Sequence, residues 1–583
     1  MGIVLLLALV SSLGLSPSPL SSQIIESTPP LLKVYFASEE ALNYLIEFDI
    51  WEINREENYV IIPNRNNLKA TLELNGYVVS TVEDPSLFSL EAAPQAFLNG
   101  YIGVLEMEAT LISTSLAYPD ITTLITYGQS HCLVQAGCTL PNGNLLNGHP
   151  LYALRITNET LGNPSQISNG MSLTQTEIIS GSKPIFLLMA GIHAREVATT
   201  DLAMRFIAHL TKKYQKDPDV TWLIDQHEIW ILPLANPDGY ELIEQGTEDG
   251  VLYYQRKNVN QASCSVWPPE SNFQFGVDLN RNHSYSWGGT GSSGSPCNTT
   301  YRGTAPASEP EVASLEALFL DLFADQRGEA RTDAAPIDTS GLLITMHSYG
   351  DLILWPWGDD GDPIIAPNHA DLGAIANRLA EYNGYLACQA STCLYPAAGA
   401  TDDFVYGELG VPSFTYEIGD QFFPPYDSVE SELWEPNLPS FIHSAKIAAA
   451  PYHLSRGPDI NAISYTLESE SVTITASASD LLSGGANIAK VELSVGQPFT
   501  ASISSDSLDE SVRIPMAAVD GNFDNSVESI VSPSIPETDL LLSGPTAIYL
   551  RGVDSDGFTG PIYAIFVERP IQYIQYLPIT GTN

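Results

Sequence analysis

The chain has 583 residues, of which 44% are hydrophobic and 16% are charged. At roughly 150 residues per domain this length predicts two to four domains, and the apolar fraction excludes an intrinsically disordered acidic chain. Because 69 acidic residues outweigh 24 lysines and arginines, the formal net charge is −45. Such a surface repels phosphate groups, which excludes nucleic-acid binding through a basic surface and attraction to an anionic membrane.

The sequence opens with an apolar run over residues 3–10, followed by small and polar residues up to Ser22. This run has the length of a signal-peptide core and is too short to span a bilayer. We therefore expect residues 1–22 to be a signal peptide and the protein to be secreted. A buried N-terminal strand or a misplaced start codon is the alternative. No later apolar run reaches about 18 residues, so no membrane span is expected.

Residues 31–85 have the pattern of a small α/β unit. The expected strands are residues 31–36, 59–63 and 77–82, and the expected helices are residues 39–48 and 66–75. The unit precedes every residue that is a candidate for catalysis or metal binding. We therefore interpret residues 23–95 as an N-terminal prosegment, cut near residues 89–95. A permanently attached accessory domain fits the same pattern.

From residue 96 to residue 456, apolar strands alternate with helices. The expected strands are residues 184–190, 228–234, 342–346 and 413–417, and the expected helices are residues 197–214, 371–382 and 438–449. Continuous apolar strands between helices predict an α/β fold whose sheet is covered on both faces.

The pattern of the sequence changes at residue 457. Short alternating segments follow, separated by Gly, Ser, Asp and Pro, at residues 471–477, 490–494 and 547–551. This pattern predicts a β-sandwich accessory domain over residues 457–570, followed by a tail over residues 571–583. The sandwich contains neither histidine nor cysteine, so we expect no catalytic role for it.

His193 and Glu196 directly follow the apolar strand 184–190. Three positions apart at the start of a helix, their side chains can point to one spot beyond the carboxyl end of a strand, where open α/β sheets bind ligands. An imidazole nitrogen and a carboxylate are suitable zinc ligands, but a catalytic zinc needs a third. Of the ten histidines, His347 closes another apolar strand and can converge on the same edge. The alternative for His347 is a core histidine.

Several motifs accompany these residues in a fixed order. They are NPDGY at 236–240, GVDLNRN at 276–282, SPC at 295–297, YRG at 301–303, HSYG at 347–350 and FTYEIG at 414–419. From about residue 100 to residue 450 the chain resembles the zinc carboxypeptidase family of the pancreatic A and B types and the bacterial T type. The resemblance implies a mixed central sheet flanked by helices.

Residue by residue, the resemblance also implies a zinc site. His193, Glu196 and His347 match the family's ligands for one zinc ion per chain, with water in the fourth position. Asp278 matches the carboxylate that orients the first histidine. Glu417 matches the general base that takes a proton from the zinc-bound water.

The resemblance assigns further residues to the substrate. Arg256 matches the group that stabilises the tetrahedral oxyanion. Asn280 and Arg281 match the pair that grips the substrate's terminal carboxylate. Tyr395 matches the mobile tyrosine that closes over the bound residue, and Arg195 matches an arginine lining more distant subsites.

Asp402 lies seven positions after Tyr395, where B-type enzymes have an aspartate and A-type enzymes an apolar residue. A carboxylate in that pocket pairs with an incoming lysine or arginine. The resemblance therefore implies a bias toward basic C-terminal residues, with apolar residues tolerated. The alternative is that Asp402 only supports its loop.

Cys264 and Cys297 resemble a family disulfide that brackets the carboxylate-binding loop. Cys132 with Cys138, and Cys388 with Cys393, are close enough in sequence for two local bridges. Three disulfides fit an exported enzyme. Free buried thiols remain the alternative for the last two pairs.

Together these features imply a secreted zinc metallocarboxypeptidase that hydrolyses the C-terminal peptide bond of peptides and proteins. One alternative is a zinc hydrolase of cell-wall or other modified peptides. Another is an inert binding module that docks through the β-sandwich, whose partner is unknown. The intact Glu417, Arg256, Asn280 and Arg281 favour the enzyme.

Overall fold

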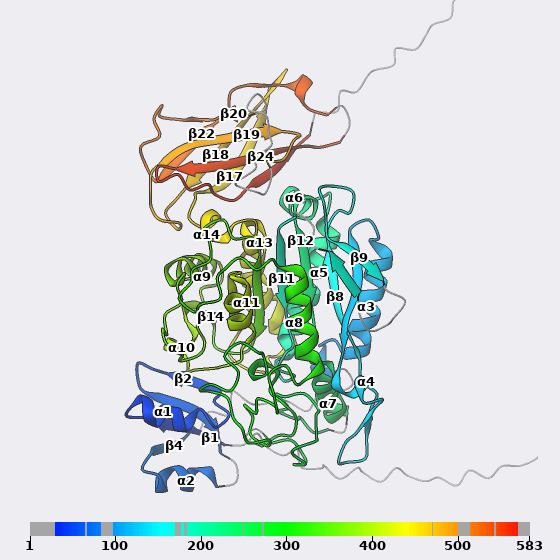
Figure 1. Cartoon of the computed structure of the whole chain (residues 1–583). Helices are drawn as coiled ribbons and strands as arrows, with labels where there is room; N and C mark the ends of the chain where they lie inside the picture. Colours follow the sequence, from blue (N-terminus) through cyan, green and yellow to red (C-terminus); the bar gives the residue numbers. More distant parts are fainter. Residues whose placement is uncertain are drawn as a thin grey trace, which may run out of the picture.

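The computed structural model describes residues 30–64, 67–82, 97–169, 176–179, 183–248, 250–270, 273–468, 470–499, 513–541 and 544–568. In Figure 1 they form three parts in a row, with a small N-terminal unit at the bottom, an α/β body in the middle and a strand-rich part at the top. The predicted signal peptide (1–22), the predicted prosegment cut (89–95) and the predicted tail (571–583) lie outside the described residues.

The N-terminal unit comprises residues 30–64 and 67–82. Its antiparallel sheet has the strand order β2-β3-β1-β4. The strands are β1 (Leu31–Tyr35), β2 (Glu52–Asn54), β3 (Tyr59–Pro63) and β4 (Val78–Val82), and the helices are α1 (Glu39–Leu45) and α2 (Leu68–Leu74). The sequence predicts all of these except β2, which is short, half-exposed and polar at both ends.

The central body is built on an eight-stranded sheet with the order β15-β14-β16-β13-β11-β12-β8-β5. The strands are β5 (Thr122–Gln129), β8 (Pro150–Ile156), β11 (Ile185–Met189), β12 (Glu228–Leu232), β13 (Leu342–His347), β14 (Leu352–Trp355), β15 (Leu386–Gln389) and β16 (Ser413–Glu417). Strands β11, β12, β13 and β16 run parallel, whereas β8 and β14 run antiparallel to them. The mixed central sheet expected from the resemblance is therefore confirmed.

Helices cover both faces of this sheet because successive side chains of the buried strands point to opposite sides. In β11, Phe186 and Leu188 face one core cluster, and Leu187 and Met189 face the other. The first face packs against α3 (Val104–Ala117), α5 (Val197–Lys213), α6 (Pro218–Gln226), α9 (His369–Asn383) and α13 (Glu435–Ile447). The second packs against α8 (Pro310–Leu322) and α11 (Thr401–Leu409).

The C-terminal part consists of two packed antiparallel sheets, which agrees with the predicted β-sandwich. One sheet has the order β17-β18-β22-β21 with β23 beside β18, and the other has the order β20-β19-β24-β25. The strands are β17 (Asp459–Leu467), β18 (Ser471–Ser479), β19 (Ile488–Val495), β20 (Ile514–Pro515), β21 (Ala517–Ala518), β22 (Val527–Val531), β23 (Ile535–Pro536), β24 (Thr546–Asp554) and β25 (Tyr563–Val567).

All six cysteines are paired in the structure. The three bonds join Cys132 to Cys138, Cys264 to Cys297 and Cys388 to Cys393. The predicted pairing is confirmed, and no cysteine is left as a free thiol. As for membrane insertion, none of the helices in the described part of the chain is both long and apolar enough to span a bilayer.

The parallel strands bring the candidate site residues to one edge of the sheet. His193 and Glu196 follow the carboxyl end of β11, and His347 ends the neighbouring strand β13. On the other side of β13, Glu417 ends β16 and stands in register with His347. Residues far apart in the sequence therefore meet where open α/β sheets bind ligands.

Candidate metal and substrate site

Three metal-binding side chains converge at this edge. Nδ1 of His193 lies 2.9 Å from Oε1 of Glu196 and 3.0 Å from Nδ1 of His347. Nδ1 of His347 lies 3.2 Å from Oε2 of Glu196. All three side chains are buried. In the described ranges, no other group of three His, Cys, Asp or Glu side chains could share one metal ion.

The chemistry of this donor set fits zinc. Nε2 of His193 lies 3.2 Å from Oδ1 of Asp278, so a proton on that nitrogen leaves the Nδ1 lone pair for a metal. Oε2 of Glu196 is buried and has no hydrogen-bond partner. A cation between these atoms would satisfy it, and two imidazoles with one carboxylate are a common set of catalytic zinc ligands.

The charges of the cluster depend on one another. Burial by itself would raise the pKa of Glu196, but His193 and His347 together lower it below the ordinary value. Burial lowers the pKa of the His347 imidazole. The cluster thus favours a carboxylate and a neutral imidazole, which are the forms that bind a metal.

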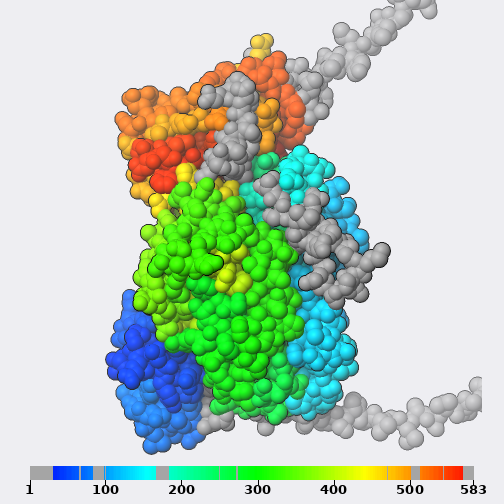
Figure 2. Space-filling view, in the orientation of Figure 1, coloured from blue at the N-terminus to red at the C-terminus, as the bar shows by residue number. Residues whose placement is uncertain are grey.

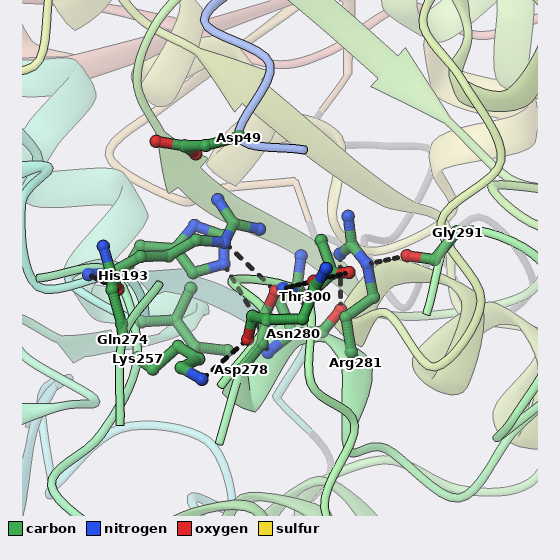
Figure 3. Close-up of polar contacts among 12 residues, drawn as sticks. Asp49, His193, Lys257, Gln274, Asp278, Asn280, Arg281, Gly291 and Thr300 are labelled. Atoms are coloured by element: carbon green, nitrogen blue, oxygen red, sulfur yellow. Dashed lines mark hydrogen bonds and ion pairs between the residues drawn. The ribbon is translucent and has the colours of Figure 1, made fainter. Parts of the chain in front are cut away.

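Asp278 touches three parts of the site and lies between His193 and Asn280 in Figure 3. Besides its contact with His193, it accepts a hydrogen bond of 3.0 Å from the guanidinium Nε of Arg256. It also accepts one of 3.0 Å from the backbone amide of Asn280. Burial would raise the pKa of Asp278, but Arg256, Arg281 and His193 hold it well below the ordinary value, so the group stays ionised.

Arg256 reaches the metal-ligand cluster from the side. Its Nη1 lies 3.9 Å from Oε1 of Glu196. Its backbone amide donates to the side chain of Gln274 at 2.9 Å. The guanidinium is thereby held next to the candidate ligands, where a charge can act on a reacting oxygen.

Asn280 and Arg281 lie on a short 3₁₀ turn that Asp278 caps. Arg281 donates from Nε to the carbonyl of Gly291 at 2.8 Å and from Nη1 to the carbonyl of Asn280 at 2.7 Å. Oδ1 of Asn280 accepts from the amide of Thr401 at 2.9 Å. These bonds hold the two side chains at the wall of the cavity described below.

Glu417 faces the same space from the end of β16. Burial and the nearby charge of Glu196 raise the pKa of Glu417 well above its ordinary range, although Arg256 and Arg281 act in the opposite direction. A carboxyl group with a raised pKa is a stronger base than usual, as a proton acceptor near neutral pH requires.

Tyr395 and Asp402 also line the cavity. Oδ2 of Asp402 accepts a hydrogen bond of 3.1 Å from the hydroxyl of Thr415, and Oδ1 accepts one of 3.0 Å from the amide of Asp403. Burial raises the pKa of Asp402. Asp402 lies in the first turn of α11 and not in a loop, as the alternative assumed. Its carboxylate supports the start of this helix and also borders the cavity, so a supporting role and a role in the pocket are compatible.

Arg195 does not face open solvent, because the N-terminal unit covers it. Both terminal nitrogens of its guanidinium donate to the carboxylate of Asp49, each at 2.7 Å. The guanidinium also lies 4.0 Å from the ring of Phe422. Sequence reasoning missed Asp49, because nothing local distinguishes it from other acidic loop residues.

Sequence reasoning also missed three other residues that support the site. Gln274 holds the backbone of Arg256, and Thr401 holds Asn280. The buried Lys257 donates to the carbonyls of Pro296 and Asn298 at 3.1 and 2.7 Å, and burial lowers its pKa to about 7. The position of Lys257 next to Arg256 could have indicated a role in supporting the site, but no sequence motif identified the carbonyl groups that it contacts.

These side chains enclose one cavity of about 780 Å³. The predicted site residues on its wall are His193, Arg195, Glu196, Arg256, Asn280, Arg281, His347, Tyr395, Asp402 and Glu417. Asp278 lies behind the wall and acts through its neighbours. The N-terminal unit contributes part of the wall, including Trp51 and Arg55. The structure thus brings together every predicted metal-binding, substrate-binding and catalytic residue.

Comparisons with known proteins agree with this geometry. The sequence profile of the zinc carboxypeptidase family matches residues 107–439. Carboxypeptidase B of Rattus norvegicus is 30% identical over 258 residues, which covers 43% of this chain and 55% of the relative. Carboxypeptidase A2 of Rattus norvegicus is 32% identical over 250 residues, which covers 42% of this chain and 53% of the relative. The chain thus spans about half the length of the curated relatives it matches.

Solved structures show the same fold. The carboxypeptidase A from Helicoverpa armigera superposes with a TM-score of 0.53 at 22% identity, covering 73% of this chain and 99% of that one. Thrombin activatable fibrinolysis inhibitor superposes with a TM-score of 0.50 at 21% identity, covering 73% of this chain and 98% of that one. With a family profile that matches more than half of the sequence, the chain belongs to the zinc carboxypeptidase family.

Proposed function

We propose that the protein is a secreted zinc carboxypeptidase that hydrolyses the C-terminal peptide bond of peptides and proteins. The observation that carries the proposal is the meeting of three zinc-binding side chains, a carboxylate base and an Asn–Arg pair in one cavity. The three disulfides and the predicted signal peptide support secretion, because such bonds persist in oxidising compartments.

His193, Glu196 and His347 would hold one zinc ion per chain. When bound, zinc lowers the pKa of a coordinated water and polarises the carbonyl of the scissile bond. Asp278 fixes the tautomer of His193 and so keeps its lone pair directed at the ion.

Arg281 and Asn280 bind the terminal carboxylate of the substrate, for which a guanidinium and an amide are suitable donors. This places the last peptide bond beside the ligand cluster and Glu417. Tyr395 covers the bound residue. Because Asn280 and Arg281 bind a free carboxylate, the enzyme would cleave the last peptide bond of a chain and leave internal peptide bonds intact.

Glu417 takes a proton from the attacking water as its oxygen adds to the carbonyl carbon. It then returns this proton to the nitrogen of the departing amino acid, so the carboxylate is regenerated in each cycle. Arg256 stabilises the negative charge that develops on the carbonyl oxygen during the addition.

Asp402 gives the pocket a preference for basic C-terminal residues. It borders the cavity, and an incoming ammonium or guanidinium would neutralise a carboxylate that is otherwise buried. Apolar residues would be accepted less well, because they leave this charge unpaired.

We also propose that the N-terminal unit belongs to a prosegment (23–95) that blocks the catalytic domain (96–456). What supports this is the contact of Asp49 with Arg195, which occupies a group assigned to substrate. Trp51 adds a stacked contact with Tyr254, their ring centroids 5.3 Å apart. Arg55 donates to the carbonyl of Leu394, next to Tyr395, at 2.8 Å.

The two alternatives are less favoured. An inert binding module does not need a complete set of zinc ligands, a general base and a pair of residues that binds the substrate carboxylate. A hydrolase of modified cell-wall peptides needs the ligands and the base, but it has no requirement for a pair directed at a free C-terminal carboxylate.

Metal analysis and hydrolysis of a blocked dipeptide test the proposal. Purified wild type should contain one zinc per chain and release the C-terminal amino acid. His347→Ala should lose both the zinc and the activity, whereas the control His209→Ala, on α5 outside the cavity, should keep both. Full zinc retention by His347→Ala would contradict the assignment of the ligands.

A further inference from the structure

We propose that the β-sandwich is an obligate folding partner of the catalytic domain, so that the two parts unfold as one cooperative unit. This inference does not depend on the proposed function. Figure 1 shows the sandwich over α6, α9, α13 and α14 (Pro451–Leu454), at the end of the body opposite the N-terminal unit. Figure 2 shows its surface meeting the body, and only residues 455–458 separate α14 from β17.

The first contact buries a lysine of the catalytic domain. Lys446, on α13, is 3% exposed. Its ammonium lies 2.8 Å from Oδ2 of Asp219, on α6, and 3.9 Å from the ring centroid of Tyr563 in the sandwich. The other oxygen of Asp219 accepts a hydrogen bond of 2.9 Å from the backbone amide of Ala564. The sandwich thus completes the surroundings of an ion pair whose lysine is buried and whose carboxylate is partly exposed.

A second ion pair crosses the boundary directly. Arg378, on α9, is 4% exposed and forms an ion pair with Asp459, the first residue of β17. The hydroxyl of Tyr563 donates to the same carboxylate at 2.6 Å. The guanidinium also lies 4.6 Å from the ring of Tyr382. Without the sandwich, Arg378 would lose the carboxylate that balances its charge.

The connection between the two parts is also tightly packed against the sandwich. The amide of Thr559 donates to Nε2 of His453, on α14, at 3.0 Å. A Cβ atom on Gly560 would lie 1.9 Å from the carbonyl oxygen of Pro458, and one on Gly457 would lie 2.3 Å from the amide of Gly560. Only glycine fits at this approach, so the connection has no room to act as a hinge.

The apolar core is continuous across the same boundary. Tyr549, Ile562 and Ala564 of the sandwich belong to one buried cluster with Trp222 and Phe441 of the catalytic domain. The sandwich also has an inner core of its own between its two sheets, which includes Leu550. Separating the parts would expose apolar surface and leave the buried Arg378 without its carboxylate, and both effects destabilise the catalytic domain.

The distribution of tryptophan makes this dependence measurable in the full chain. All eight tryptophans lie before residue 457, so the sandwich contains none. Tryptophan fluorescence therefore reports the surroundings of side chains in the body, including Trp222 in the cluster that continues into the sandwich. If the parts are coupled, a substitution in the inner core of the sandwich must shift a signal that arises elsewhere.

The experiment follows thermal unfolding by tryptophan fluorescence and by calorimetry. Leu550→Ala removes a fully buried side chain of the inner core and should lower the fluorescence midpoint by about 2–5 °C. Gly560→Val, which forces the backbones apart, should also lower it. The control Val519→Ala, at a position 64% exposed on the sandwich, should leave it unchanged.

An unchanged fluorescence midpoint in Leu550→Ala, together with a separate earlier calorimetric transition, would overturn the proposal. If Leu550→Ala cannot be purified in folded form, Gly560→Val decides alone, because it leaves the inner core intact. In that variant, an unshifted midpoint would equally reject the coupling. None of these readouts is an activity, so the result is independent of the proposed catalysis.

Discussion

At the scale of single residues, Asp278 links the functions of the site. One carboxylate contacts a candidate metal ligand, the candidate oxyanion arginine and the amide of Asn280. Its negative charge is shared between His193 and Arg256, and its pKa is held well below the ordinary value. The relative positions of the candidate metal ligands and the proposed substrate-binding groups therefore depend on one ionised side chain.

Replacing the proposed base should separate metal binding from turnover. Glu417→Gln keeps the shape of the side chain but cannot accept the proton of the attacking water. We expect the zinc content to stay at one per chain and kcat to fall by roughly 10²–10⁴-fold. Zinc analysis and steady-state kinetics on a blocked dipeptide measure both quantities, and Glu408→Gln on α11 serves as the control. Activity above about a tenth of wild type would reject the general-base role.

The pocket carboxylate should determine the preference for basic residues. Because a hydrogen bond to a charged group contributes about 1.5–3 kcal/mol, Asp402→Ala should lower the ratio of kcat/KM for peptides ending in Arg to those ending in Leu by roughly 10- to 100-fold. Thr415→Val, which removes the hydroxyl bound to Asp402 and keeps the carboxylate, is the matched control. If Asp402→Ala leaves the ratio unchanged, Asp402 only supports the start of α11 and its contact with β16.

At the scale of elements, one histidine joins two helices. Nδ1 of His149 lies 2.9 Å from Oε1 of Glu108, on α3, and Nε2 lies 3.0 Å from Oε2 of Glu241, on α7 (Pro237–Glu248). Burial would lower the pKa of His149, but the two glutamates raise it to about 9. The doubly bonded imidazolium therefore holds α3 against α7 over the neutral pH range.

This contact predicts a pH-dependent stability. A pKa raised from 6.5 to about 9 in the folded state stabilises the fold fully below pH 6.5, and the contribution disappears as the pH rises through 9. We expect His149→Gln to lower the free energy of unfolding by at most about 3 kcal/mol at pH 6, and by much less at pH 10. Urea unfolding of both proteins at several pH values measures the difference. A difference that does not change with pH would show that His149 is not charged in the fold.

At the scale of the whole molecule, the N-terminal unit closes one end of the body and the sandwich closes the other (Figure 1). The connection between the unit and the catalytic domain lies within a stretch of unusual composition, because residues 70–154 contain neither lysine nor arginine. Of the two flanking basic residues, Lys69 lies within α2. Arg155 lies in strand β8 of the eight-stranded sheet and is 3% exposed.

A protease that cleaves after Lys or Arg should therefore fail to release the unit. If the unit is a prosegment, we expect trypsin to leave the enzyme latent and a protease that cleaves after small residues to raise its activity. N-terminal sequencing and activity measurements after each digestion test this. Ala92→Arg adds a trypsin site in the connection and should make trypsin effective. Full activation of wild type by trypsin would contradict the prediction, whereas release of the unit without a gain in activity would reject the blocking role alone.

Much of the catalytic body was predictable from local pattern. The buried strands β11 and β13 appear as nearly continuous apolar runs, because each is covered on both faces. In β16, Phe414 and Tyr416 alternate with smaller polar residues, although the strand is buried up to Tyr416. The candidate metal-binding and catalytic residues lie at or just after the ends of these strands, so His193, His347 and Glu417 could be identified by their positions. By contrast, β2 is too short and too polar to give a periodic signal.

What the sequence by itself determined is the central strands β11, β12, β13 and β16 with helices α5, α9 and α13, the ligand spacing of His193 and Glu196, and the motifs of the family. Only the tertiary structure decided which distant groups meet: Asp49 with Arg195, Asp278 with Arg256, and Lys446 with Tyr563. The physical reason is the distance along the chain over which each signal acts. Hydrophobic periodicity and ligand spacing act over a few residues and are visible in the chain, whereas an ion pair between separate elements depends on how whole sheets and helices pack.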